Sequence, residues 1–153
     1  MIKYVPEMTS VVLEEIPGKL TLAVEISNCQ GNCKGCHSPF LKKDIGEELT
    51  PSVASRLVAE NFGVNCFLFL GEGNDRTALL ALARCLRLEF PEMELALYSG
   101  REQVEEDIRE AFDYVKTGPY REECGPLNNP GTNQRLHYHG EDITHRFWHK
   151  KES

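Results

Sequence analysis

The feature of this sequence that most constrains its fold is a repeated alternation of short apolar segments and longer amphipathic ones. Residues 64–70 form a nearly continuous apolar run, which is typical of a strand buried on both faces. Residues 20–27 alternate between apolar and polar side chains, which is typical of a strand with one buried face. Further strand patterns lie at residues 11–16, 93–98 and 113–116. Helical patterns lie at residues 50–62, 75–90 and 104–112. This order predicts βαβ units and a mostly parallel sheet.

The first two helices carry start signals. Thr50 is a good cap for a helix whose first residue is Pro51, and Gly63 is expected to end that helix. Its inner stripe is expected to contain Ala54, Leu57, Val58, Asn61 and Phe62. Asn74 or Asp75 is expected to cap the next helix. The inner residues of that helix are expected to be Leu79, Leu82, Ala83, Leu86 and Phe90.

In a parallel sheet, the loops that follow the strands meet at one edge, where functional sites commonly lie. The sequence therefore places together the loops at residues 29–36, 71–75, 99–100 and 117–118. Residues 117–134 are rich in Pro and Gly and predict an irregular segment. Residues 134–139 and 143–147 predict a closing hairpin around residues 140–142.

Composition narrows the class of protein. The chain has 153 residues, of which 41% are hydrophobic and 27% charged, which suits one globular domain over residues 1–153. The net charge of -7, with no run of Lys and Arg, argues against nucleic acid as a partner. The first residues lack the apolar core of a signal peptide, and no apolar run is long enough for a membrane span. These features predict a cytoplasmic protein, in which six cysteines are more often ligands or buried side chains than disulfides.

The chemistry is expected to centre on Cys29, Cys33 and Cys36, which follow a strand and lie in a Gly-rich loop at residues 28–38. Three convergent thiolates can bind a soft metal or an iron–sulfur cluster. A [4Fe–4S] cluster held by three cysteines keeps one iron open, whereas structural zinc requires a fourth ligand. His37 adjoins Cys36 too closely to be an easy fourth ligand. A cluster, a zinc ion and a fortuitous triplet remain alternatives at this point.

The C-x3-C-x2-C spacing resembles the signature of the radical S-adenosylmethionine superfamily. Within it, several segments resemble the anaerobic ribonucleotide reductase activating proteins. These segments are Ile16-Pro17-Gly18, Ser27-Asn28-Cys29, Cys33-Lys34-Gly35-Cys36-His37, Asp113-Tyr114-Val115-Lys116-Thr117-Gly118-Pro119-Tyr120 and Thr132-Asn133-Gln134-Arg135. The resemblance runs from about Ile16 to Arg135, which is most of the chain.

The resemblance implies a fold, an activity and partners. The fold would be an incomplete, TIM-like barrel of βα units, with a C-terminal loop and hairpin at residues 117–148. Cys29, Cys33 and Cys36 would ligate a [4Fe–4S] cluster, and S-adenosylmethionine would chelate the fourth iron. Reductive cleavage would give methionine and a 5′-deoxyadenosyl radical, which would abstract hydrogen from a glycine of the large reductase subunit. A reduced flavodoxin- or ferredoxin-like protein would donate the electron to this oxidoreductase.

The resemblance also assigns residues around S-adenosylmethionine. The turn at Gly71, Glu72, Gly73, Asn74 and Asp75 occupies the place of a Gly-Gly-Glu or Gly-Gly-Asp turn that holds the amino group of the cofactor. Here Glu72 stands between the two glycines, so either Glu72 or Asp75 would supply the acid. The alternative is a plain turn in which the Asp caps a helix.

Three further positions would lie near the rest of the cofactor. Gly35, Cys36 and His37 would surround the adenine, and His37 is equally well interpreted as a surface residue. Ser99 begins a Ser-Gly turn that would contact the ribose or the carboxylate, and a plain loop cap explains it equally well.

The other three cysteines and four of the histidines are not expected to form a second metal site. Cys66 and Cys85 are predicted to be buried, because free cysteine packs as a small apolar residue. Cys124 is isolated in a loop. His137, His139, His145 and His149 lack a ligand spacing, so surface positions explain them better than a second metal.

Three rival functions remain. The first is an activase of another glycyl-radical enzyme, such as a formate-lyase-like one. The second is a non-catalytic iron–sulfur protein that transfers electrons, and the third is a zinc-stabilised binding module.

Overall fold

The structure is a computed structural model that describes residues 2–6, 9–12, 16, 19–26, 46–71, 75–99, 101, 104–118 and 132–147. The strands are β1 (Lys3–Tyr4), β2 (Ser10–Val12), β3 (Thr21–Glu25), β4 (Glu47–Glu48), β5 (Cys66–Leu70), β6 (Glu94–Tyr98), β7 (Tyr114–Thr117), β8 (Arg135–Tyr138) and β9 (Glu141–Asp142). The helices are α1 (Pro51–Glu60), α2 (Arg76–Glu89), α3 (Glu106–Ala111) and the 3-10 helix η3 (Thr144–Phe147).

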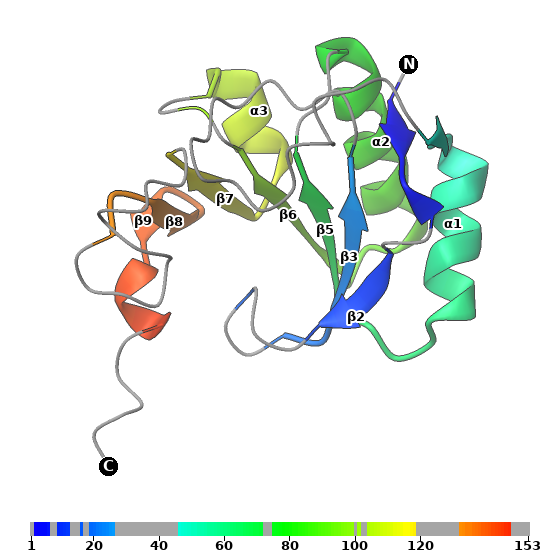
Figure 1. Cartoon of the computed structure of the whole chain (residues 1–153), viewed down its shortest axis with the longest axis horizontal. Coiled ribbons are helices and arrows are strands. Elements are labelled where there is room, and N and C mark those ends of the chain that lie inside the picture. Colours follow the sequence, from blue (N-terminus) through cyan, green and yellow to red (C-terminus); the bar gives the residue numbers. More distant parts are fainter. Residues whose placement is uncertain are drawn as a thin grey trace.

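Seven strands form the main sheet, in the order β2-β3-β5-β6-β7-β8-β9 (Figure 1). The four central strands β3, β5, β6 and β7 are mutually parallel, which confirms the expected strand–helix units. β2 runs antiparallel to β3, and β8 and β9 add an antiparallel hairpin beyond β7. A separate two-stranded sheet joins β1 to β4.

The prediction of an incomplete TIM-like barrel is wrong. The sheet is open and mixed, and in the described part of the chain β2 and β9 lie at its two ends without pairing to each other. Strand–helix repeats are shared by open sheets and barrels. What decides between them here is the antiparallel strand at each side of the parallel core, because a TIM-like barrel requires each added strand to be parallel.

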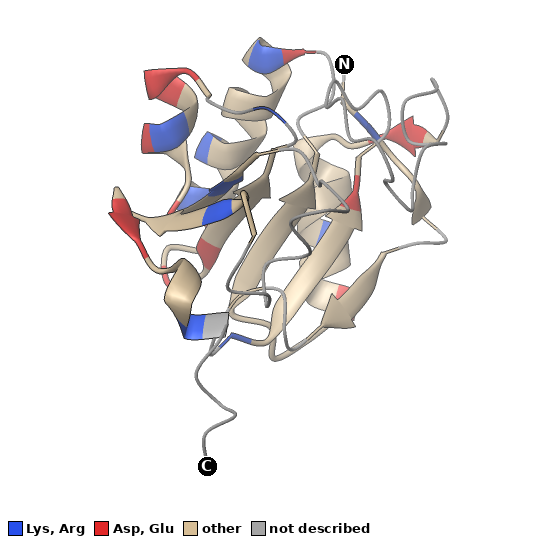
Figure 2. Ribbon diagram, turned by 60° about the vertical axis from the view of Figure 1, so that its left-hand side comes forward, with Lys and Arg blue, Asp and Glu red and all other residues tan. Residues whose placement is uncertain are grey.

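The two faces of the sheet carry different cores. The helices pack on the face that presents Leu22, Phe67, Phe69 and Leu95, and this core is continuous with residues of α1, α2 and α3. On the opposite face, Leu68 and the small side chains of Ala23 and Ala96 pack with residues from before β3 and from β8 onward. That second core contains Ile16, Ala23, Cys66, Leu68, Ala96, Tyr114, Leu136 and Ile143. Charged residues gather mainly on the helices and hairpin, while the central strands are largely uncharged (Figure 2).

Helix α1 begins as the sequence predicts, but it ends earlier. The hydroxyl oxygen of Thr50 accepts a hydrogen bond from the Val53 amide at 3.2 Å, and Pro51 is the first helical residue of α1. The predicted end is wrong, because α1 stops at Glu60 and Asn61 caps it, before Gly63. Phe62 therefore lies beyond the helix and is 97% exposed, so its place in the inner stripe is also wrong.

The closing hairpin differs in detail from its prediction. β8 pairs with β9 through His137 and Asp142, and the turn falls at His139 and Gly140, whose φ angles are 49° and 89°. The predicted second strand at residues 143–147 is largely the 3-10 helix η3. Near the N-terminus, the strand expected at residues 11–16 is β2, which ends at Val12.

Within the described ranges, no helix is both long enough and apolar enough to cross a membrane.

Candidate functional site

The carboxyl ends of the four parallel strands meet at one edge of the sheet (Figure 1). Glu25, Leu70, Tyr98 and Lys116 are successive partners across β3, β5, β6 and β7. The segments that begin just after these residues start side by side, because the strands are parallel and in register. This confirms that the segments after the four parallel strands begin at one edge of the sheet. Those segments are residues 27–45, 71–75, 99–100 and 117–118.

Gly71 lies against the point where the chain enters the cysteine loop. Its φ is 120°, and a Cβ added to it would lie 3.4 Å from the carbonyl oxygen of Ile26. The Ile26 amide donates to the carbonyl oxygen of Leu70 at 3.2 Å. The start of the glycine turn and the residue that precedes the loop are therefore adjacent. Only glycine adopts this backbone conformation without strain.

Asp75 caps helix α2. Its carboxylate oxygen Oδ1 accepts a hydrogen bond from the Ala78 amide at 3.0 Å. The helix buries Leu79, Leu82, Ala83 and Leu86 as predicted, whereas Phe90 is the half-buried residue after its end. Of the two predicted caps, Asp75 is the one in place. Since one carboxylate oxygen holds the helix start, the carboxylate of Asp75 is fixed at the edge of the sheet.

Ser99 is fully buried at the same edge. Its amide donates to the Lys116 carbonyl at 2.8 Å, and its hydroxyl oxygen accepts from the Arg101 amide at 3.1 Å. This second contact is a local hydroxyl-to-backbone turn of the kind serine commonly forms. The structure thus shows Ser99 as a loop cap, and a contact with cofactor remains a prediction.

Gly118 joins two segments that are far apart in the sequence. Its amide donates to the Arg101 carbonyl at 2.6 Å, and its carbonyl accepts from the Gln134 side-chain amide at 3.2 Å. A Cβ on Gly118 would lie 3.2 Å from both the Asn133 carbonyl oxygen and the Gln134 Cα. Residues 117–118 and 132–135, which are distant in the sequence, therefore pack together at this edge.

Most of the predicted ligands lie outside the described residues. They are Cys29, Cys33, Gly35, Cys36, His37, Glu72, Gly73 and Asn74. The cysteines that the structure does describe are Cys66 and Cys85. Cys66 is buried as predicted, and burial raises the pKa of its thiol to about 12. The prediction for Cys85 is wrong, because it lies on the exposed side of α2.

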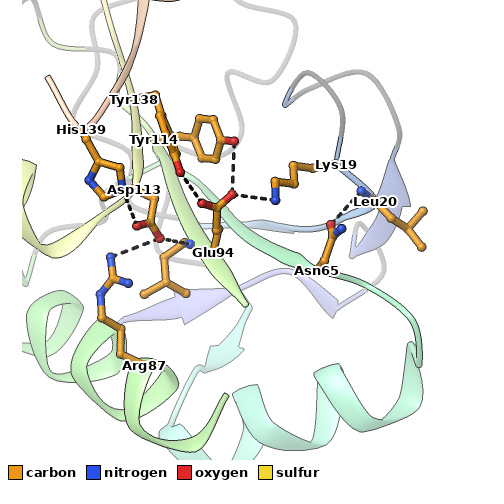
Figure 3. Close-up of polar contacts among 10 residues, drawn as sticks. Lys19, Leu20, Asn65, Arg87, Glu94, Asp113, Tyr114, Tyr138 and His139 are labelled. Carbon is orange, nitrogen blue, oxygen red and sulfur yellow. Dashed lines mark hydrogen bonds and ion pairs between the residues drawn. The ribbon is translucent and has the colours of Figure 1, made fainter. Parts of the chain in front are cut away.

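A second polar group lies at the amino end of the parallel strands and was missed by the sequence reasoning (Figure 3). The Glu94 carboxylate accepts from the hydroxyls of Tyr138 at 2.7 Å and Tyr114 at 3.2 Å, and it pairs with the Lys19 ammonium at 2.8 Å. Burial alone would raise the pKa of Glu94, but Lys19 and the tyrosine hydroxyls hold it below its usual value. Glu94 is therefore a satisfied carboxylate.

Asp113 forms the other half of this group. Its carboxylate accepts from the Leu95 amide at 2.8 Å and pairs with Arg87 at 3.2 Å and with the His139 Nε2 at 3.0 Å. The backbone of His139 also donates to the Asp113 carbonyl at 3.0 Å. Asp113 thus ties β6, α2 and the β8–β9 turn to the start of β7.

Glu94, Asp113 and His139 place possible ligand atoms within 4.8 Å of one another, and they are the one such group among the residues described. Each carboxylate already faces a cation, Lys19 or Arg87, so a metal ion would have to displace these pairs. These contacts indicate that Glu94 and Asp113 anchor the β8–β9 hairpin. Glu94, Asp113 and His139 are far apart in the sequence and do not follow the spacing of a known metal-binding motif. Their proximity depends on the pairing of β7 with β8, which the sequence alone does not show.

Comparisons of the chain with protein-family models, with curated proteins and with solved structures found no match.

Proposed function

We propose that this chain is a radical S-adenosylmethionine activase that generates the glycyl radical of an anaerobic ribonucleotide reductase. The observation that carries the proposal is the contact of Gly71 with Ile26. It brings the start of the glycine turn beside the entry to the segment that contains Cys29, Cys33 and Cys36, at the carboxyl edge of a parallel sheet. Ligands of α/β proteins bind at that edge.

The residues at this edge suit the cofactors. Cys29, Cys33 and Cys36 would be deprotonated and would hold three irons of a [4Fe–4S] cluster. Gly71 has no side chain, so its backbone can approach the ammonium of S-adenosylmethionine closely. Together the two cofactors supply a one-electron cleavage of the sulfonium and a carbon radical that abstracts hydrogen. No residue need act as general acid or base, and the task of the chain is to bind, to orient and to exclude water.

The experiment that tests the activity is anaerobic reconstitution of the full chain with iron and sulfide, followed by S-adenosylmethionine and dithionite. We expect a brown protein that forms 5′-deoxyadenosine and methionine. A colourless protein would support the zinc module and overturn the proposal. A brown protein that leaves S-adenosylmethionine intact would support the electron-transfer alternative.

The Cys33→Ala variant tests the ligand assignment in the same assay. We expect it to lose the chromophore and the cleavage activity while it keeps the unfolding transition of the wild-type apoprotein, because the sequence predicts that Cys33 lies in a loop. Global unfolding of this variant would instead indicate a structural metal and would contradict the assignment. The matched control is Cys85→Ala, an exposed cysteine on α2 that we expect to be silent.

A further inference from the structure

The short strand β1 contacts both ends of the segment that contains the three cysteines. At the entry, the Val5 amide donates to the Glu25 carbonyl at 3.0 Å, and Tyr4 forms an antiparallel bridge with Ile26. At the exit, Tyr4 pairs with Glu47 in the β1–β4 sheet. One residue, Tyr4, is thus the backbone partner of both ends.

The exit is extended by two further contacts of β1. Lys3 pairs with Glu48, and the Leu49 amide donates to the carbonyl oxygen of Ile2 at 2.7 Å. The side chains of Ile2, Tyr4 and Leu49 are each at most 2% exposed and belong to the core on the helical face. The contacts of β1 are therefore anchored in the main core.

Gly46 makes the close approach at the exit possible. Its φ is 95°, and a Cβ added to it would lie 2.1 Å from the Tyr4 carbonyl oxygen. That distance is far below a van der Waals contact, and the neighbouring atom is backbone that is held on both sides. Any side chain at this position must push β1 away from the exit of the loop.

We propose that residues 2–5 and Gly46 form a clasp that sets the separation of the two ends of the cysteine segment and so positions its three thiolates. Holding the ends of a loop together removes part of the entropy that its ligands would otherwise lose on converging. Gly46 and Tyr4 are then positioning residues for metal binding. This inference rests on the proposed function, since it takes Cys29, Cys33 and Cys36 as ligands.

The test uses the full-length apoprotein and Co²⁺ alone as the probe, read by the thiolate-to-cobalt charge-transfer absorption. The variant is Gly46→Ala, and the matched control is Gly140→Ala, where φ is 89° but nothing lies within 4 Å of an added Cβ. Both variants carry the strain of a positive φ, and only Gly46→Ala carries the clash. We expect Gly46→Ala to bind Co²⁺ at least about tenfold more weakly than the control, because its clash with the Tyr4 carbonyl displaces β1 from the exit of the cysteine segment.

Hydrogen exchange on the wild-type protein gives a readout that needs no variant. Coupling between two sites is reciprocal, so Co²⁺ binding should slow amide exchange in residues 2–5 and 46–49. The β8–β9 turn at residues 139–140, at the amino edge, should be unaffected.

Two outcomes separate this inference from the proposed function. If wild-type protein gives no thiolate-to-cobalt absorption, the assignment of the three ligands fails and the proposed function fails with it. If wild-type protein binds Co²⁺ through thiolates, but Gly46→Ala binds as tightly as Gly140→Ala or exchange at residues 2–5 and 46–49 is unchanged, the clasp alone is overturned.

Discussion

At the scale of single residues, Glu94 connects parts of the described sequence that lie far apart. Its carboxylate contacts Lys19, Tyr114 and Tyr138, which lie before β3, on β7 and on β8. Replacing it with Gln removes the charge that these donors share. We expect Glu94→Gln to lower the free energy of unfolding by about 1.5–3 kcal/mol, the usual contribution of hydrogen bonds to a charged group. Urea unfolding at neutral pH measures this difference.

The effect of Glu94→Gln should depend on pH. The folded-state pKa of Glu94 lies below its unfolded value, so its stabilisation is present above about pH 4.3 and is lost as the pH falls through the folded pKa. The gap between wild type and Glu94→Gln should therefore shrink at acid pH. A gap that stayed constant down to pH 3 would contradict the assigned role of the charge. Glu92→Gln, at an exposed position in the preceding turn, is the control.

Asp75 offers a second test at this scale, because it separates capping from cofactor binding. Asn caps a helix as well as Asp does, so Asp75→Asn should change the free energy of unfolding by less than about 0.5 kcal/mol. Asp75→Ala should lower it by about 1 kcal/mol. If Glu72 supplies the acid, Asp75→Asn should also bind S-adenosylmethionine like wild type in calorimetric titrations of the reconstituted protein. A strong loss of affinity would assign the acid to Asp75.

Local signals in the sequence predicted some residues well and others not. Thr50 and Asp75 could be predicted as caps because the interaction spans only three residues. Phe62 could not, because its exposure depends on where the helix ends. The exposure of Cys85 follows from the helical period, because a stripe of Leu79, Leu82 and Leu86 turns residue 85 away from the sheet. Glu94 and Asp113 were missed because their partners are distant in sequence.

At the scale of elements, the β8–β9 hairpin depends on the amino-edge group. Tyr138 and Tyr114 stack with ring centroids 4.6 Å apart, and both hydroxyls reach Glu94 (Figure 3). His139 holds the following turn to Asp113. The first strand of the hairpin and the neighbourhood of its turn were predictable from the sequence, whereas the second strand, β9, was not. Its attachment required knowledge of the pairing between β7 and β8.

Tyr138→Phe tests this attachment, because it keeps the stacked ring and removes the hydroxyl. Loss of one hydrogen bond to the Glu94 carboxylate should cost about 1.5 kcal/mol and speed amide exchange in residues 135–142 roughly tenfold through local opening. Exchange in β5 should not change. The matched control is Tyr4→Phe, whose hydroxyl accepts a hydrogen bond from Arg56 of α1. Equal exchange in the hairpins of wild type and Tyr138→Phe would show that the hydroxyl does not anchor it.

At the scale of the whole molecule, the described strands form an open sheet in place of a closed barrel (Figure 1). The parallel strands could be predicted because each carries its own apolar pattern. The open form could not, because it is decided by the antiparallel strands β2 and β8, whose direction follows from long-range pairing. An open sheet suits the proposed substrate, a glycine-containing loop of another protein that must reach the cofactors.

The most direct test of the central claim is electron paramagnetic resonance on the large subunit of an anaerobic ribonucleotide reductase. The subunit is incubated with the reconstituted protein, S-adenosylmethionine and dithionite, and with Cys33→Ala as the control. We predict a glycyl radical signal with wild-type protein and none with Cys33→Ala. Cleavage of S-adenosylmethionine without that signal, together with a signal on a formate-lyase-like enzyme, would contradict the assigned partner. Absence of both cleavage and signal would contradict the activase itself.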